Sequence, residues 1–211
     1  MVRVKICGIT NLGDARAAID AGADMLGVNF YRPSSRYITP DAARELVNEL
    51  KSLGSAVEVV GVFVNETIES VLDVASVTGI DAVQLHGDES PSFCEEINTR
   101  DGLRVIKALR VSDEFMPEHG QRYPVHGIML DAFHSSLRGG TGQTIDLAVA
   151  LETRKLVPRL FLSGGLSPEN VADAIHRVAP YAVDACSLLE SAPGKKDAAR
   201  MREFVAAVRS S

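Results

Sequence analysis

The sequence predicts an α/β fold in which eight parallel β-strands close into a barrel surrounded by helices, the (β/α)8 or TIM barrel. Short β-rich segments alternate with amphipathic segments, which is typical of parallel sheets connected by crossover helices. The count of eight favours a closed barrel over an open doubly wound sheet. The open sheet is also disfavoured because the first strand leads into Cys-Gly-Ile-Thr at 7–10, not into Gly-x-Gly-x-x-Gly.

The predicted strands are short segments of β-branched and aliphatic residues. In chain order they are residues 2–6, 25–30, 59–64, 82–85, 105–109, 127–130, 160–162 and 182–185. No segment rich in Pro, Gly or Ser divides the chain. We therefore expect a single catalytic domain over residues 1–211.

Helices are predicted between most of these strands. The first covers Leu12–Ala21 and ends at Gly22, a residue that readily adopts the left-handed conformation of a helix end. Thr-Pro-Asp at 39–41 opens the second helix with proline in its first turn, and Ser-Pro-Glu at 167–169 opens a later one. The chain thus repeats one strand–helix unit.

The composition indicates a globular protein and argues against a nucleic-acid partner. Of the 211 residues, 45% are hydrophobic and 24% are charged, so the chain can bury a large core. The formal net charge is −6 and Lys and Arg form no block, whereas nucleic-acid binders usually carry a basic face. An anionic substrate therefore needs local hydrogen-bond donors.

The sequence also argues against membrane and metal partners. No apolar run approaches the ~20 residues that span a bilayer, and charged Arg3 and Lys5 interrupt the N-terminal apolar stretch, unlike in a signal peptide. Cys7, Cys94 and Cys186 are too widely spaced for a disulfide framework or a zinc site. We therefore expect a cytoplasmic protein with reduced thiols and no zinc site. We also expect a monomer, since nothing in the sequence marks an interface.

Strand parity points to two reactive side chains at the C-terminal ends of the strands, where barrel active sites lie. Because side chains alternate between the faces of a strand, Lys5 and Cys7 should point into the barrel and Ile6 outward. Asp131 shares its face with Met129 and should also point toward the mouth. Cys7 and Asp131 would then suit a general base and a general acid. The alternative, which carries equal weight, is that Cys7 only packs in the core and that Asp131 only caps a turn.

Both roles require help from neighbouring groups. A free thiol with a pKa near 8.5 is only about 3% ionised at pH 7. A base at Cys7 therefore needs a positive neighbour, for which Lys5 is the candidate. For Asp131 to act as an acid, its pKa must instead be raised, and burial has that effect.

Glycine-rich loops suggest a phosphate site. Ser-Gly-Gly-Leu at 163–166 follows the seventh strand, and barrel enzymes often bind phosphate between the loops after strands seven and eight. Glycine permits close backbone approach, and free N–H groups at a helix start attract anions. Gly-Gly-Thr-Gly at 139–142 could flank this site, although simple turn glycines are the alternative. The histidines, His134 included, show no metal-ligand spacing, and only His86 lies at a strand end.

An ordered set of segments then resembles one known family. The segments are residues 4–10 (Val-Lys-Ile-Cys-Gly-Ile-Thr), 27–30, 34–38, 62–65, 83–87 (Val-Gln-Leu-His-Gly), 130–131, 139–142, 162–166 and 193–197. In these residues the chain resembles the phosphoribosylanthranilate isomerases of tryptophan biosynthesis, over essentially its whole length. The resemblance implies a cofactor-free Amadori rearrangement of N-(5-phosphoribosyl)anthranilate to 1-(o-carboxyphenylamino)-1-deoxyribulose 5-phosphate.

The resemblance also implies roles for individual residues. Asp131 matches the acid that protonates the furanose ring oxygen, and Cys7 matches the base that removes the C2′ proton. Arg36 matches the arginine expected near the anthranilate carboxylate. Gly164 and Gly165 match backbone positions that bind the phosphate of the small-molecule substrate.

The eighth loop departs from the family pattern. Where the family typically has Asp-Val-Ser-Ser-Gly-Val-Glu, residues 184–190 are Asp-Ala-Cys-Ser-Leu-Leu-Glu. Ser187 is retained for phosphate binding, but Leu188 replaces a glycine where the backbone should approach the phosphate, so we expect weaker binding. Parity turns Cys186 inward, and barrel closure should bring it near Cys7. Cys186 is then either a small apolar replacement for serine or a redox partner.

Two other functions remain open from the sequence. The histidine-pathway isomerase performs the same rearrangement on another amine, but it is expected to use a carboxylate where this chain has Cys7, and the same base argues against a bifunctional isomerase. A phospho-ligand binding protein without catalysis would explain the altered eighth loop. The presence of both Cys7 and Asp131 argues against a binding protein without catalysis.

Overall fold

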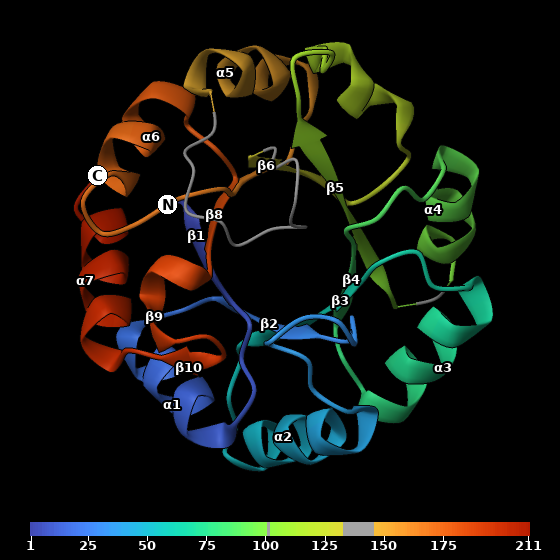
Figure 1. Ribbon diagram of the computed structural model, residues 1–211, viewed down its shortest axis with the longest axis vertical. Helices are drawn as coiled ribbons and strands as arrows, with labels where there is room; N and C mark the ends of the chain where they lie inside the picture. The colour runs from blue at the N-terminus through green and yellow to red at the C-terminus, as the bar shows by residue number, and fades with distance from the viewer. Residues whose placement is uncertain (101, 133–145) are drawn as a thin grey trace.

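The fold is a closed barrel of eight parallel strands, as predicted. The computed structural model describes residues 1–100, 102–132 and 146–211. Its barrel strands are hydrogen-bonded in chain order from β1 to β8, and β8 pairs back with β1. Figure 1 shows the strands at the centre and the helices as an outer ring.

The barrel strands agree with the predicted segments to within two residues at each end. They are β1 (Arg3–Cys7), β2 (Met25–Asn29), β3 (Glu58–Phe63), β4 (Ala82–Leu85), β5 (Arg104–Val111), β6 (Gly127–Ala132), β7 (Leu160–Leu162) and β8 (Ala182–Ala185). The sixth strand extends two residues beyond the predicted segment. Asp131 therefore lies within β6 and is held by the sheet.

The α-helices that the structure describes surround the barrel. They are α1 (Leu12–Ala21), α2 (Pro40–Ser52), α3 (Ile68–Thr78), α4 (Pro91–Asn98), α5 (Leu147–Leu156), α6 (Val171–Val178) and α7 (Ala198–Arg209). The predicted signals for α1 and α2 are confirmed, since Gly22 ends α1 with φ 99° and the Thr39 side chain accepts a hydrogen bond from the N–H of Ala42.

One predicted helix start was wrong. The helix after β7 begins at Val171, not at 167–169, because Ser167 and Asn170 close a separate turn in which Asn170 Oδ1 accepts from the Ser167 N–H at 2.8 Å. Between β5 and β6, where no particular helix was predicted, the chain forms a short 3₁₀ helix, η1 (Pro117–Arg122).

Two apolar layers confirm the predicted strand parity. Val4 and Ile6 belong to the outer layer between strands and helices, whereas Met129 belongs to the cluster inside the barrel. Lys5 is fully buried among the strands and Asp131 is 4% exposed. The alternation of side chains thus directs charged groups into the barrel and toward its mouth.

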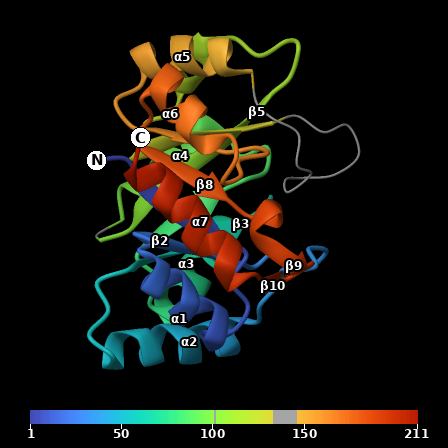
Figure 2. The ribbon, with the colours of Figure 1, turned by 90° about the vertical axis from the view of Figure 1, so that its left-hand side faces the viewer.

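The mouth of the barrel carries an additional hairpin that the sequence did not predict. Its strands are β9 (Glu190–Ala192) and β10 (Lys195–Lys196), which pair antiparallel after β8. Figure 2 shows this hairpin at the end of the molecule opposite to the N-terminus. It therefore lies on the side toward which the barrel strands run.

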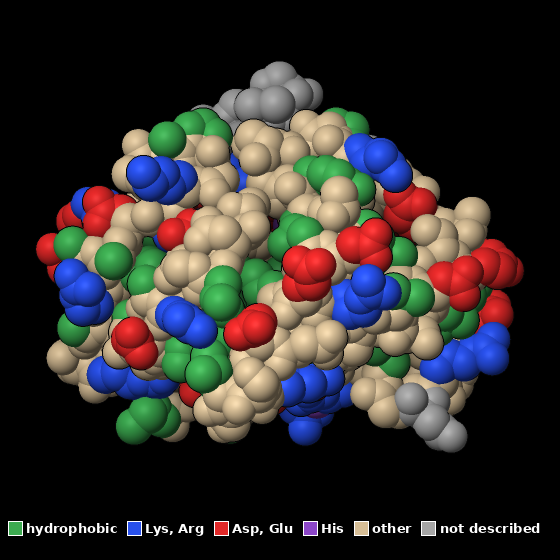
Figure 3. Space-filling model, turned by 90° about the horizontal axis from the view of Figure 1, so that it is seen from below, with side chains coloured by type: hydrophobic (Ala, Val, Ile, Leu, Met, Phe, Trp, Pro, Cys, Tyr) green, Lys and Arg blue, Asp and Glu red, His purple; other side chains and the backbone are tan. Residues whose placement is uncertain are grey.

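The outer surface matches the mixed charge of the sequence. On the face shown in Figure 3, acidic and basic side chains are interspersed and no continuous basic patch is seen. In the described part of the chain, no helix is both long enough and apolar enough to cross a membrane.

Candidate active site

Cys7 lies at the mouth of the barrel beside Cys186. Cys7 is the last residue of β1, and the register of β1 with β8 pairs Ile6 with Ala185, so the next residues along the two strands are Cys7 and Cys186. Each thiol shifts the pKa of the other, and both residues are partly exposed to solvent. The predicted proximity of Cys186 to Cys7 is confirmed.

This environment favours the thiolate of Cys7. The hydrogen bond from Cys186 lowers the pKa of Cys7; burial opposes this effect, and the charge of Lys5 adds to it, which brings the pKa to about 6. The same bond, together with burial, raises the pKa of Cys186. The pair thus loses its first proton from Cys7, and its thiolate is favoured at neutral pH.

A buried ion pair supports Cys7 from below. Lys5 Nζ donates to Asp184 Oδ1 at 2.7 Å, and the Ser163 hydroxyl donates to Asp184 Oδ2 at 3.1 Å. Burial alone would lower the pKa of Lys5, but the negative charges of Asp184 and Cys7 outweigh it and raise that pKa. Lys5 is therefore a permanent cation beneath the thiolate, as the sequence suggested.

Asp131, near the end of β6, is joined to a histidine and a glutamine at the end of β4, and β5 lies between the two strands. Its Oδ2 lies 3.1 Å from His86 Nε2, and His86 Nδ1 lies 2.7 Å from Gln84 Nε2. In this orientation the Gln84 amide donates to Nδ1, so Nε2 carries the imidazole proton and donates to the Asp131 carboxylate. His86, which the sequence left as a possible participant, thus contacts the predicted acid.

The Gln84 amide can also turn so that His86 is able to hydrogen-bond to the protonated form of Asp131. Among the described residues, Gln84 Oε1 is buried without a hydrogen-bond partner. Rotating the amide by half a turn would place Oε1 against His86 Nδ1, which would then donate. His86 Nε2 could then accept a hydrogen bond from the neutral carboxyl of Asp131. The three side chains can accommodate both states of an acid that gives up and regains a proton.

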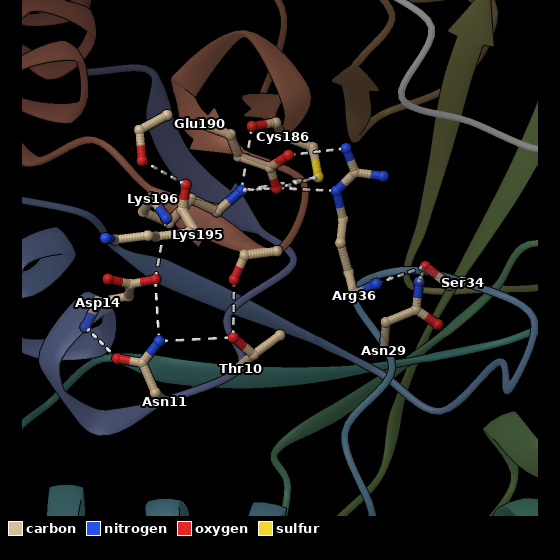
Figure 4. A network of polar contacts seen from close by, with 12 residues as sticks. Thr10, Asn11, Asp14, Asn29, Ser34, Arg36, Cys186, Glu190, Lys195 and Lys196 are labelled. Carbon is tan, nitrogen blue, oxygen red and sulfur yellow. Dashed lines mark hydrogen bonds and ion pairs between the residues drawn. The ribbon is translucent and has the colours of Figure 1, made fainter.

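Arg36 lies on the opposite side of the mouth and is held by the hairpin (Figure 4). Its Nε and Nη2 donate to the two carboxylate oxygens of Glu190, each at 2.8 Å. Glu190 Oε1 also accepts from Lys196 Nζ at 2.9 Å, and the Lys196 side chain is fully buried. Lys196 Nζ reaches Cys186 as well, at 3.0 Å from its carbonyl oxygen and 3.7 Å from its sulfur.

The charges of this cluster stabilise one another. A hydrogen bond to Glu190 raises the pKa of Arg36 against the effect of burial. Burial would raise the pKa of Glu190, but the hydrogen bond from Arg36 and the charge of Lys196 lower it. Within the residues the structure describes, Arg36 Nη1 donates to no protein acceptor. One edge of the guanidinium is thus locked, and the other can meet an anion.

The predicted phosphate residues follow two neighbouring strands. Gly164 and Gly165 come after β7 in left-handed conformations with φ of 90° and 65°, and a side chain at 164 would collide with Ala132. Ser187 opens a 3₁₀ turn, η2 (Ser187–Leu189), shortly after β8, which pairs with β7. The first N–H groups of such a turn have no partner within it and can bind an anion.

Leu188 fits this turn without backbone strain. The backbone of Leu188 does not adopt the left-handed conformation, and the residue is only partly buried. Its carbonyl accepts from Arg200 Nε at 2.7 Å. Any effect of Leu188 on phosphate therefore comes from the bulk of its side chain.

Sequence reasoning missed several groups around the mouth. It did not pair Glu190 or Lys196 with Arg36, and it overlooked a second buried ion pair between Lys107 Nζ and Glu89 Oε2 at 2.7 Å. A lysine inside the apolar strand β5 was the available signal for that pair. The predicted glycines at 139–142 and His134 lie outside the described residues. Cys94 is fully buried in α4.

Comparisons with known proteins agree with this geometry over the whole chain. A family model described as N-(5′-phosphoribosyl)anthranilate (PRA) isomerase matches residues 4–207. An N-(5′-phosphoribosyl)anthranilate isomerase of Thermotoga neapolitana is 48% identical over 205 residues, which cover 97% of each chain. A crystal structure of phosphoribosyl anthranilate isomerase in complex with reduced 1-(o-carboxyphenylamino)-1-deoxyribulose 5-phosphate has a TM-score of 0.88 at 44% identity, with 100% of both chains covered.

A further solved structure is described as monomers of dimeric phosphoribosylanthranilate isomerase from Thermotoga maritima. It has a TM-score of 0.85 and 43% identity, and the alignment covers 100% of both chains. The similarity therefore extends across every barrel strand.

Proposed function

Because this chain belongs to the N-(5′-phosphoribosyl)anthranilate isomerase family, we propose that Cys7 is its general base and Asp131 its general acid. The chain is an isomerase of tryptophan biosynthesis, and it catalyses the Amadori rearrangement of N-(5-phosphoribosyl)anthranilate. One observation carries the assignment of the base. Cys7 is a partly exposed thiol at the barrel mouth whose pKa is lowered to about 6 by Cys186 and Lys5.

The first step opens the sugar ring. The neutral carboxyl of Asp131 gives its proton to the furanose oxygen while the bond between C1′ and that oxygen breaks. The lone pair of the anthranilate nitrogen forms the C=N bond of a Schiff base. His86 then donates to the new Asp131 carboxylate through Nε2, the contact of 3.1 Å that holds this oxygen in place.

The second step moves a proton from carbon. The thiolate of Cys7 removes the C2′ proton, and the electron pair of the C–H bond forms the C1′=C2′ bond of an enolamine. The C=N electrons return to nitrogen, so the Schiff base becomes neutral. The enolamine tautomerises to the ketone. Lys5 and the Cys186 thiol stabilise the thiolate before the transfer.

The remaining groups bind the two ends of the substrate. The phosphate meets the backbone of Gly164 and Gly165 and the start of the turn at Ser187, where the left-handed glycines leave room for close approach. The anthranilate carboxylate meets the free edge of Arg36, which Glu190 holds in position. No step requires a metal or a nicotinamide.

We also propose, from the sequence, where and in what form the enzyme works. It would act in the cytoplasm as a monomer with one catalytic domain, without nucleic acid or membrane as a partner. The relative described as dimeric is a precedent for a second copy. Sedimentation equilibrium tests the monomer directly, because a dimer would double the measured mass.

The test of the catalytic pair is steady-state turnover of freshly generated phosphoribosylanthranilate, followed by loss of anthranilate fluorescence. Cys7→Ala and Asp131→Ala should each lower kcat by orders of magnitude, while Cys94→Ser, a buried thiol in α4, is the matched control for removing a cysteine. Variants that keep wild-type kcat would overturn the assigned roles. An inactive wild type that still binds phosphate analogues would indicate a binding protein.

A further inference from the structure

We propose that Cys7 and Cys186 form a site of reversible oxidation, at which a hydroperoxide converts the thiol pair into a disulfide and stops the isomerase. The effect on activity rests on the proposed role of Cys7 as general base. The formation of the disulfide rests only on the geometry of the pair.

The backbone places the two cysteines at a separation that a disulfide can bridge. Ile6 and Ala185 are paired in the parallel strands β1 and β8; Cys7 is the last residue of β1, and Cys186 is the first residue after β8. Neighbouring strands lie about 4.8 Å apart, within the roughly 4.4–6.8 Å between Cα atoms that disulfides span. A Cβ added at Gly8 would lie 3.0 Å from the Cys186 sulfur, and one at Gly27 would lie 2.6 Å from that of Cys7, so both sulfurs are packed at the same mouth.

The surroundings favour oxidation at Cys7 rather than elsewhere. Both thiols of the pair are partly exposed, whereas Cys94 is fully buried. Lys5 lies beneath Cys7, and Lys196 Nζ lies 3.7 Å from the Cys186 sulfur. The lowered pKa of Cys7 makes it the thiolate, and the thiolate is the form that attacks peroxides.

The chemistry balances with the hydroperoxide as the only oxidant. The Cys7 thiolate attacks one oxygen of the O–O bond and becomes a sulfenic acid, and the other oxygen leaves with its electron pair and takes up a proton. The Cys186 sulfur then attacks the sulfenic sulfur, its thiol proton leaves, and hydroxide leaves as water. The two sulfurs together have lost two electrons, and the peroxide has gained them.

The disulfide stops Cys7 from acting as a base and also protects it from further oxidation. A sulfur bound to Cys186 cannot accept the C2′ proton, so turnover stops. It also cannot be oxidised further to the irreversible sulfinic acid, and a dithiol restores both cysteines.

The experiment treats the complete wild-type chain with hydrogen peroxide and measures the mass of its alkylated peptides alongside isomerase activity. We expect a peptide pair joined between residues 7 and 186, activity lost in proportion to that pair, and recovery of both with dithiothreitol. Cys186→Ser should form no joined pair, and excess peroxide should carry its Cys7 through the sulfenic to the sulfinic acid, after which dithiothreitol no longer restores activity. Cys94→Ser is the matched control and should behave as wild type.

Each contrary result has a separate meaning. Oxidation of wild-type Cys7 to the sulfinic acid without a joined pair would overturn the proposal. A joined pair with undiminished activity would overturn both the switch and the role of Cys7 as base. If Cys186→Ser is not folded by circular dichroism, Cys186→Ala replaces it. The peptide masses decide the disulfide even in a preparation without isomerase activity.

Discussion

Lys5 Nζ and Asp184 Oδ1 lie 2.7 Å apart inside the barrel, where the two side chains are only 0% and 6% exposed. Each neutralises a charge that the strands would otherwise enclose without a partner. Because the pair connects β1 to β8, it also joins the two ends of the closed sheet.

Removing one member of this pair should destabilise the barrel strongly. Lys5→Met leaves the Asp184 carboxylate buried and uncompensated, which typically lowers the free energy of unfolding by about 3–5 kcal/mol. Urea unfolding measures this change. The double variant Lys5→Met/Asp184→Leu should recover much of the loss. The control Arg100→Met breaks an exposed pair with Glu96 and should change stability by less than about 1 kcal/mol. Equal losses in both single variants would contradict the assignment.

The acid limb of the pH profile should report Cys7. The active base is the thiolate, so kcat/KM and the rate of iodoacetamide alkylation should fall as the pH drops below about 6, the pKa of Cys7. The hydrogen bond from Cys186 and the cations Lys5 and Lys196 favour the thiolate, and Asp184 opposes it. Cys186→Ala should move the midpoint to higher pH.

A matched thiol distinguishes this effect from general reactivity. Burial raises the pKa of Cys94 to about 11, so that thiol should remain unmodified across the same range. An alkylation midpoint near the ordinary thiol value of about 8.5 would contradict the stabilising role of Cys186 and Lys5.

A side chain at residue 164 should disturb the phosphate loop. Gly164→Ala would combine φ of 90° with a Cβ only 2.6 Å from the Ala132 nitrogen, so the loop must shift. We expect an increased KM and a loss of about 1–3 kcal/mol of stability. The control is Gly54→Ala, where φ is 67° but a Cβ meets no described atom within 4 Å, so only the backbone strain of about 1 kcal/mol remains. An unchanged KM in Gly164→Ala would show that the phosphate binds elsewhere.

The bidentate geometry of Arg36 should matter more than its charge. A lysine cannot satisfy both Glu190 oxygens and present a planar edge to a carboxylate, so Arg36→Lys should raise KM roughly tenfold or more with a smaller effect on kcat. Arg44→Lys, which alters an exposed pair with Asp41 on α2, is the control. Wild-type KM in Arg36→Lys would contradict the proposed contact with the anthranilate carboxylate.

Leu188 offers a gain-of-binding test. Its side chain occupies the turn at which the phosphate is proposed to bind, although its backbone is unstrained. Leu188→Gly should lower KM with little change in kcat, because a glycine lets the backbone approach the phosphate. Steady-state kinetics measure both constants, and an unchanged KM would reject a steric role for Leu188.

The local pattern of the chain was sufficient to predict much of this molecule. The period of two along β1 and β6 set which side chains point inward, so Lys5, Cys7 and Asp131 could be placed before the structure was known. The helix ends at Thr39 and Gly22 follow from local backbone chemistry and were also predicted correctly. Local signals were weaker where a turn competes with a helix, as at Ser167, where the predicted helix start was wrong.

The partners at the mouth could not be predicted in this way. Arg36 and Glu190 are 154 residues apart, and neither segment carries a pattern that points to the other. The contact between His86 and Asp131 depends on where two strands end around the closed sheet. The hairpin that carries Lys196 could not be predicted either, because its residues show no periodic pattern of apolar and polar side chains.

The sequence alone therefore determined the barrel, the inward faces of its strands and the reactive residues at their ends, because side-chain alternation and capping are local properties. Only the tertiary structure decided what these residues touch. Closing the barrel brings β8 against β1, which places Cys186 on Cys7 and Asp184 on Lys5. Those contacts set the charge on Cys7, since the pKa of a thiol depends on the groups around it in space and not on its neighbours in the chain.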